Sequence, residues 1–325
     1  MRVIEFKEYG GPEVLKTVEA VVPEPGPGQV TIDTAYAGVN FADLKARAEG
    51  YRVTALPVVP GLEVSGRIRA VGEGVTGLRI GQEVAAFLDG GGYAEVALAP
   101  AATVFPLPEG VDLRTGATLP TVLPTAHALL HEIGRLRAGE SVLVQGAAGG
   151  VGTVAGQLAR AAGAGTVYGV VSSEAKAEYA LAHGYDEVFV GDSFADEVRR
   201  ATGGRGVDLV LDAVGGETLR RGLDSLAVFG RLVSFGNAGG GEPWRVGQPE
   251  LYPGSRSVAG FSILELALSD PATLRTVAER AFRAVTEGHV DLPVTAEFAL
   301  SDAAEAHLLM EGRTSTGKLV LRIAD

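Results

Sequence analysis

Residues 146–152 read Gly-Ala-Ala-Gly-Gly-Val-Gly, and this stretch decides the fold. It follows an apolar run at 141–144, typical of a buried strand, and precedes an alanine-rich stretch at 153–162, typical of a helix. A strand, a glycine turn and a helix N-terminus form a site for a pyrophosphate, because unpaired N–H groups and the helix dipole point at the anion. Glycine is required where the backbone must approach the ligand closely. We therefore expect a dinucleotide to lie on Gly146, Ala147, Gly149, Gly150, Val151 and Gly152.

The spacing of these glycines is G-x-x-G-x-x-G and not the usual G-x-G-x-x-G, so the pattern alone would also suit a tightly packed loop. The surrounding chain favours the cofactor. Apolar strands are expected at 141–145, 166–171, 187–190, 208–211 and 231–235, and helices at 125–133, 153–162, 174–182, 194–201 and 217–226. This alternation predicts a parallel, doubly wound sheet, in which ligands bind at the carboxyl ends of the strands.

Composition excludes several classes of function. The chain has 325 residues, 46% of them hydrophobic, which suits a globular protein of two domains. There is no cysteine, so disulfides, thiolate metal sites and a cysteine nucleophile are ruled out. The net charge of −12 makes nucleic acid an unsuitable partner. Apolar runs are too short to span a membrane, and residues 1–6 do not resemble a signal peptide, so we expect a cytoplasmic protein that does not bind membranes.

The first 122 residues have a different pattern. Short apolar runs at 29–37, 64–71, 83–88 and 93–98 are separated by Gly and Pro, which predicts a compact β-rich domain with one short helix at 41–48. After about residue 264 we expect a long helix at 271–285, a helix near 302–311 and a final strand at 319–323.

The residues after the second expected strand indicate which dinucleotide binds. An NAD site places an acidic residue there to bind the ribose 2′-hydroxyl. Here the strand ends at Val171, and Ser172, Ser173 and Lys176 follow. Two hydroxyls and an ammonium favour a 2′-phosphate, so NADPH is the expected cofactor. Two alternatives stay open: Lys176 as a solvated helix residue, and Glu174 on the ribose.

Short motifs follow one another along the chain in a characteristic order. They are VNFAD at 39–43, PGLEVSG at 60–66, AVGEGV at 70–75, GYAE at 92–95, the glycine stretch, DAVGG at 212–216 and SFGN at 234–237. This ordered set resembles the medium-chain dehydrogenase/reductase superfamily, and within it the zinc-free branch of NADPH:quinone oxidoreductases.

The resemblance implies a fold and an assembly. A Rossmann domain at 123–264, with a doubly wound parallel sheet, is inserted in a GroES-like β-rich catalytic domain formed by 1–122 and 265–325. The resemblance also implies a homodimer in which an edge strand near Val258 to Ile263 pairs across the two-fold axis.

Zinc-dependent members carry a histidine in a G-H-E triplet and a cysteine in the first active-site segment. Here Leu62 occupies the histidine position, and a leucine cannot ligate a metal. His127 and His131 lie four residues apart on one expected helix, and we interpret them as surface or packing residues. No metal site is expected.

The resemblance also assigns roles to individual residues. It places Asn40 at the nicotinamide ribose or the acceptor oxygen, and Thr125 at the carboxamide, although Thr125 also suits a helix N-cap. Ser173, Lys176 and Arg313 match positions near the adenosine phosphate, and Phe235, Gly236 and Asn237 are expected to line the nicotinamide half at the end of the last strand.

Hydride transfer needs a hydrogen-bond donor for the developing charge on the acceptor, and Asn40 and Tyr51 are candidates. Asp43 is expected to orient a neighbour, with a simple helix-start charge as the alternative; for Tyr51 the alternative is a loop aromatic. Two departures from the family pattern stand out. Lys45 occupies a position where relatives often carry a tyrosine. Gly191 occupies a position where some relatives carry a tyrosine that covers the phosphate.

These expectations define one main function and two alternatives. The main function is a zinc-independent oxidoreductase that transfers a hydride or electrons from NADPH to a quinone or another conjugated carbonyl. The first alternative is an enone or enoyl reductase of the same superfamily. The second is a non-enzymatic NADPH-binding protein with a structural or sensory role.

Overall fold

The computed structural model describes residues 1–240 and 243–324. It separates into two compact units. The first unit comprises Met1–Val122, Leu264–Phe282 and Leu292–Asp325, and the second comprises Leu123–Ile263 and Arg283–Asp291. The expected division assigned 123–264 to the second unit and 265–325 to the first, whereas here Leu264 belongs to the first unit and Arg283–Asp291 to the second. Helix α10 (Pro271–Thr286) runs from one unit into the other, so no turn signal in the sequence marks this boundary.

Among the described residues, the second unit is built on a six-stranded sheet in the order β10-β9-β8-β11-β12-β13. All neighbouring strands are parallel, which confirms the predicted doubly wound sheet. The strands are β8 (Ser141–Gln145), β9 (Thr166–Val171), β10 (Glu187–Val190), β11 (Val207–Asp212), β12 (Leu226–Ser234) and β13 (Ser257–Gly260).

Two expected strand ends need correction. The edge strand expected near Val258 to Ile263 is β13, which ends at Gly260, and Ile263 begins helix α9 (Ile263–Ser269). An apolar run alone does not show where a strand ends. Phe235, Gly236 and Asn237 follow β12 and do not belong to it, and β12 is not the last strand of the sheet, because β13 follows it.

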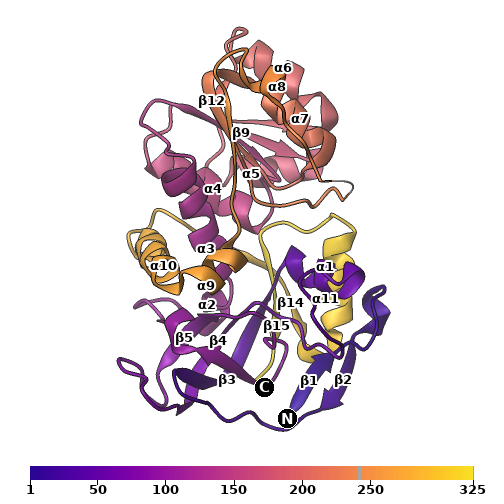
Figure 1. The fold of residues 1–325 in the computed structure, drawn as a ribbon, viewed down its shortest axis with the longest axis vertical. Helices are drawn as coiled ribbons and strands as arrows, with labels where there is room; N and C mark the ends of the chain where they lie inside the picture. Colours follow the sequence, from indigo (N-terminus) through magenta and orange to yellow (C-terminus); the bar gives the residue numbers. More distant parts are fainter. Residues whose placement is uncertain (241–242, 325) are drawn as a thin grey trace. The chain divides into compact units, whose positions relative to one another are not determined.

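Helices cover both faces of this sheet. Phe194 of α6 (Phe194–Ala201) and Leu219 of α7 (Gly216–Asp224) share an apolar core with Leu143 of β8. Because side chains alternate along a strand, Val142 and Val144 face the other way, where α4 contacts β8 and β9. α6 and α7 pack against each other (Figure 1). The helices of this unit are α4 (Gly150–Ala161), α5 (Ala177–Leu181), α6 (Phe194–Ala201), α7 (Gly216–Asp224) and α8 (Gln248–Leu251).

The helix expected at 125–133 begins earlier and changes type. α3 spans Leu119–His127 with Pro124 inside it, and a π-helical segment follows at Ala128–Ile133. Proline usually ends a helix because it lacks an N–H, so the sequence favoured a start after Pro124. The apolar side chains of this segment, Leu119 and Leu123 among them, are fully buried, and this packing outweighs the local preference.

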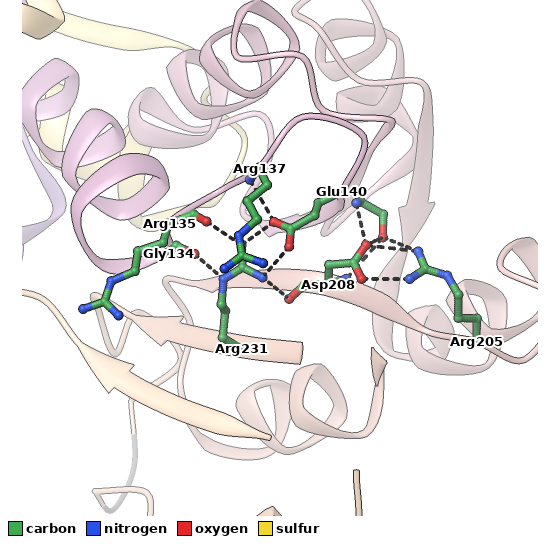
Figure 2. Close-up of polar contacts among 8 residues, drawn as sticks. Gly134, Arg135, Arg137, Glu140, Arg205, Asp208 and Arg231 are labelled. Carbon is green, nitrogen blue, oxygen red and sulfur yellow. Dashed lines mark hydrogen bonds and ion pairs between the residues drawn. The ribbon is translucent and has the colours of Figure 1, made fainter. Parts of the chain in front are cut away.

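A polar cluster ties the amino ends of the central strands together (Figure 2). Arg231 of β12 donates to the carbonyls of Gly134, Arg135 and Asp208, and it pairs with Glu140 just before β8. Asp208 of β11 accepts the Ser141 N–H at 2.8 Å and pairs with Arg205 at 2.8 Å. These contacts fix the amino ends of the strands, which lie opposite the ends expected to bind ligand.

The first unit is mainly β-structure. Over the described residues its large sheet has seven strands in the order β14-β15-β3-β4-β5-β7, with β6 also paired to β3. Its strands are β3 (Gln29–Val39), β4 (Glu63–Val71), β5 (Glu83–Phe87), β6 (Val96–Pro100), β7 (Val104–Pro106), β14 (Val294–Ala299) and β15 (Lys318–Arg322), and β1 (Arg2–Glu5) and β2 (Lys16–Glu19) form a separate antiparallel pair (Figure 1).

The helices of the first unit are short apart from α10. They include α1 (Phe41–Glu49), α2 (Leu113–Gly116) and α11 (Ala303–Glu311). The core joins Ile32 of β3, Val64 of β4 and Leu319 of β15 to Leu44 of α1 and Ala306 of α11. The long central strand β3 therefore connects the two ends of the chain within one apolar core, and it leads directly into α1.

No helix in the described part of the chain is long and apolar enough to cross a membrane.

The Arg231 cluster predicts a measurable stability difference. Arg231 is 18% exposed and bonds to four partners, so Arg231→Met should lower the free energy of unfolding by about 1.5–3 kcal/mol, the value of hydrogen bonds to charged groups. Urea denaturation measures it. The control is Arg221→Met, which removes an ion pair with the 82% exposed Asp192 and should change stability by no more than about 1 kcal/mol. Equal losses in both variants would contradict the account.

Candidate functional site

The end of β3 presents Asn40 at the start of α1. Asn40 is the N-cap of this helix, with extended φ and ψ of −122° and 152°, and is 8% exposed. Its main-chain N–H donates to Asp43 Oδ2 at 2.9 Å, which is half of a capping box. Both ends of its side-chain carboxamide are also bound, the nitrogen to Glu63 and the oxygen to Lys318.

Lys318 and Glu63 hold the Asn40 carboxamide. Lys318 Nζ lies 2.6 Å from Glu63 Oε1, donates to Asn40 Oδ1 at 2.8 Å and donates to the Val39 carbonyl at 3.0 Å. Glu63 Oε1 also accepts from Asn40 Nδ2 at 2.9 Å, and Oε2 accepts the Thr121 N–H at 2.9 Å. Neither Lys318 nor Glu63 was predicted as a site residue. The available signal was a charged residue directly before each of two expected strands, 64–71 and 319–323, since a buried charge needs a partner.

Asp43 acts inside the protein. It is 2% exposed, and its two oxygens accept the N–H groups of Asn40 and Gly61, the latter at 3.1 Å. Burial raises the pKa of Asp43 to about 7, although the two N–H donors and Lys318 oppose the shift. Asp43 therefore caps α1 and anchors the turn at Gly61.

A second buried cluster adjoins Asp43. Tyr93 is fully buried and its hydroxyl lies 3.1 Å from Nε2 of His307 in α11. Burial and the nearby Asp43 carboxylate raise the pKa of Tyr93, and burial together with the positive charge of Arg47 lowers the pKa of His307 to about 3. His307 is therefore neutral at physiological pH. Arg47 is itself completely buried and pairs with Glu311. Sequence reasoning did not identify this cluster.

The remaining candidates in the first unit lie nearer the surface. Tyr51 is 43% exposed in the turn after α1, where its N–H donates to the Lys45 carbonyl. Lys45 forms an ion pair with Glu49, one turn further along α1. Arg313 follows α11 with a φ of 52°, and its side chain is exposed. Tyr51 is accessible to a ligand, whereas Asp43 is not.

The glycine loop of the second unit has the geometry of an anion site. Gly146 follows β8 with a φ of 69°, which favours glycine, and a Cβ on Gly152 would lie 2.3 Å from the Gly146 carbonyl oxygen. Helix α4 begins after Gly149, and within the described chain no side chain caps it. Its first N–H groups therefore point out of the carboxyl edge of the sheet, where they suit a pyrophosphate.

The expected phosphate residues follow the neighbouring strand. β9 pairs with β8 and ends at Val171, so Ser172 and Ser173 emerge beside the glycine loop, and both are exposed. Ser173 precedes a 3₁₀ turn, Glu174–Lys176, and Lys176 is half-buried. Gly191 follows β10, the next strand outward, with a φ of 76°. A tyrosine would be strained in that conformation.

The ends of β11 and β12 form a third part of the same edge. Asp212 is buried and accepts N–H groups of Val214 and Gly215 and the Ser234 hydroxyl, and its burial raises its pKa. Phe235, Gly236 and Asn237 follow, and a Cβ on Gly215 would lie 2.5 Å from Asn237 Oδ1. The structure thus brings this segment to the carboxyl edge that also carries the glycine loop.

Thr125 lies inside α3, 5% exposed, and is not a helix N-cap. The helix N-cap alternative for Thr125 is therefore wrong. The rings of His127 and His131 are in tilted contact, with centroids 4.6 Å apart and an interplanar angle of 51°, and burial lowers the pKa of His131. Among the described residues, no group of three or more His, Asp or Glu side chains could hold a metal ion.

Comparison with known proteins identifies the family. Two family profiles match, "Alcohol dehydrogenase GroES-like domain" at residues 26–109 and "Zinc-binding dehydrogenase" at 150–282. A quinone oxidoreductase of Rattus norvegicus is 36% identical over 327 residues, covering 99% of this chain and 97% of the relative. The chain belongs to the medium-chain dehydrogenase/reductase superfamily.

Within this superfamily the chain belongs to the quinone oxidoreductase family, as the resemblance implied. A 2-haloacrylate reductase of Burkholderia sp is 35% identical over 321 residues, 96% of each protein. The structure of Escherichia coli quinone oxidoreductase complexed with NADPH matches with a TM-score of 0.92 at 30% identity, covering 99% of this chain and 100% of that one. The GroES-like and Rossmann architecture is thereby confirmed.

The raised pKa of Asp43 predicts a pH-dependent contribution to stability. Between about pH 4 and pH 7 the folded protein holds a proton that the unfolded chain has released, so the contribution of Asp43 to stability falls as pH rises. The free energy of unfolding of the wild type minus that of Asp43→Asn should decline across this interval and level off above about pH 8. Urea titrations at several pH values test this. A difference independent of pH would show that Asp43 keeps an ordinary pKa.

Proposed function

We propose that this protein is an NADPH-dependent reductase that transfers a hydride to a quinone or another conjugated carbonyl and uses no metal. The observation that carries the proposal is the carboxyl edge of the second unit's sheet. There the uncapped start of α4 suits the pyrophosphate, and Ser172, Ser173 and Lys176 follow the adjacent strand. The polar cluster around Asn40 in the first unit supplies a hydrogen-bonding group of fixed position.

NADPH is proposed over NADH on the chemistry of these residues. A 2′-phosphate is a dianion with strong acceptors, and it suits two exposed hydroxyls with a lysine better than a site with a carboxylate. Arg313 of the first unit is proposed to add a guanidinium, whose planar fork matches phosphate oxygens. Solved relatives crystallised with NADPH support this choice.

Each residue group has a proposed part in the reaction. NADPH, when bound, supplies a hydride to an electrophilic carbon of the acceptor, and a solvent proton completes the two-electron reduction. Thr125, Phe235, Gly236 and Asn237 would hold the nicotinamide half. Asn40 would donate to the cofactor ribose or to the acceptor oxygen, with Tyr51 as a further donor at the acceptor. Asp43 is a positioning residue, because its carboxylate is enclosed.

The metal-free part of the proposal rests on the residues present. Leu62 stands where zinc-dependent members have a histidine ligand, and the chain has no cysteine. Positioning and exclusion of water are therefore the proposed sources of rate enhancement, and they can supply roughly 7–11 kcal/mol of the barrier.

A second acceptor class has specific support. The 2-haloacrylate reductase among the relatives is named for an activated alkene. Quinones and enones share a carbonyl conjugated to a carbon–carbon double bond, so the same donor at the oxygen would serve both. Lys45, which replaces a tyrosine common in relatives, places a cation where an aromatic ring would stack on a quinone. This difference favours a smaller, polar conjugated acceptor as the alternative substrate.

We also propose that the protein is a homodimer. β13 is the edge of the second unit's sheet in the described chain, so its outer N–H and C=O groups can pair with a second copy. Val228 and Phe229 of the neighbouring strand β12 are 64% and 76% exposed, which supplies apolar surface beside this edge. In a dimer, covering the edge strand and these two side chains would remove exposed surface that favours aggregation.

Cofactor preference can be tested at Lys176. Lys176→Ala should lower the preference for NADPH over NADH, measured as the ratio of kcat/KM values, roughly ten- to hundredfold, because a charge-assisted hydrogen bond to the 2′-phosphate is lost. Glu174→Ala is the control and should leave NADPH kinetics unchanged. Equal losses with both cofactors would place Lys176 away from the phosphate, and a selective loss with NADH in Glu174→Ala would place Glu174 on the ribose.

The proposed reaction can be tested with an acceptor screen. NADPH oxidation is followed by absorbance with 9,10-phenanthrenequinone, a cyclic enone and an unconjugated ketone, before and after exhaustive chelation. We expect turnover with one or both conjugated acceptors, none with the ketone, and no effect of the chelator. Tight NADPH binding without any turnover would favour the non-enzymatic alternative, and loss of activity on chelation would contradict the metal-free proposal.

A further inference from the structure

The buried pair beside Asn40 is satisfied on every side. Lys318 and Glu63 are 3% and 0% exposed in their side chains. An ammonium has three N–H donors, and those of Lys318 have three acceptors: Glu63, Asn40 and the Val39 carbonyl. Glu63 uses one oxygen for Lys318 and Asn40 and the other for the Thr121 N–H. A Cβ on Gly38 would lie 2.3 Å from Glu63 Oε1, so β3 packs closely against this carboxylate.

This arrangement allows the Asn40 carboxamide only one orientation. Lysine has no acceptor and a carboxylate has no donor, so the amide oxygen must face Lys318 and the amide nitrogen must face Glu63. A flipped amide would turn its oxygen toward a carboxylate and its NH₂ toward an ammonium. The chemistry of the two partners therefore assigns the amide oxygen and nitrogen.

One N–H group of Asn40 is left for a ligand. The amide oxygen is engaged by Lys318 and the first N–H by Glu63. The main-chain N–H is bound to Asp43, which fixes the backbone as well. Of the polar hydrogens of Asn40, only the second amide N–H has no partner among the described residues. Any partner that this group binds must supply an acceptor.

We propose that Lys318 and Glu63 are positioning residues that lock the Asn40 carboxamide so that it presents an N–H donor to a ligand oxygen. This inference rests on the proposed function, in which Asn40 lies at the nicotinamide ribose or at the acceptor. The oxygen belongs either to a ribose hydroxyl of NADPH or to the carbonyl of the acceptor. In both cases Asn40 recognises a lone pair, and a ligand group that has a donor but no acceptor at this point is not recognised.

The test must separate positioning from simple structural support. Removing one charge would leave the other buried and unpaired and could unfold the protein, so the main variant removes both: Lys318→Met with Glu63→Leu. The double variant is compared with Asn40→Ala, with the triple combination, and with Arg69→Gln/Asp33→Asn, which removes an exposed ion pair between β4 and β3. Folding is checked by circular dichroism and Tm, NADPH Kd by fluorescence titration, and kcat with the best acceptor.

We expect the folded double variant to lose about five- to tenfold in NADPH affinity or in kcat, the value of one oriented hydrogen bond. The triple variant should lose little more affinity or kcat than Asn40→Ala alone, because the three residues act as a unit. A loss in affinity alone assigns the oxygen to the cofactor ribose, and a loss in kcat alone assigns it to the acceptor. The Arg69/Asp33 control should match the wild type.

Two failures are distinguishable. If Asn40→Ala changes neither affinity nor kcat, the proposed role of Asn40 is wrong. If Asn40→Ala is impaired but the folded double variant is not, the positioning inference is wrong while the proposed function stands.

Should the double variant fail to fold, the wild type still provides the test. The side-chain amide resonances of Asn40, identified by their loss in Asn40→Ala, should shift on adding NADPH or a conjugated acceptor. Resonances that move with neither would overturn the inference.

Discussion

The buried ion pair between Lys318 and Glu63 is the constraint on which the first unit's site depends. Two charges removed from water are tolerated only when every donor and acceptor is satisfied, and here the partners come from β15, β4, the end of β3 and the start of α3. Loss of one partner would leave an unpaired buried charge at a cost of about 3–5 kcal/mol. The pair therefore fixes four segments, and it does so at the residue that starts α1. Asn40 is held as a consequence of how the domain folds.

The proposed phosphate site in the second unit depends on a different kind of interaction. A cofactor phosphate must be attracted by a chain with a net charge of −12, so the attraction has to be local. The uncapped N-terminus of α4 provides it through main-chain N–H groups, and the close approach at Gly152 keeps the helix start against the turn. The polar cluster of Arg231 and Asp208 secures the opposite ends of the strands, leaving the carboxyl edge for ligand.

Much of the second unit was predictable because its signals are local. The expected bounds of the strands at 166–171 and 187–190 and of the helix at 194–201 are those of β9, β10 and α6, each flanked by a clear turn. The early start of α3 was missed because packing overrides the local effect of Pro124. Lys318 and Glu63 were missed for another reason. They are 255 residues apart in the sequence, and no pattern in either motif shows that the two charges meet. Asn40 was identified through the family resemblance, but the orientation of its amide depends on those two partners.

In the proposed function, this chain carries out a hydride transfer from NADPH in a site of fixed geometry. The most direct test is the single-turnover rate of NADPH oxidation with the fastest acceptor, using NADPH deuterated at C4 on one face or the other. A site of fixed geometry removes the hydrogen from one face only. One stereoisomer should therefore slow the reaction severalfold while the other reacts at the undeuterated rate. Equal rates for both isomers would contradict a hydride transfer of fixed geometry.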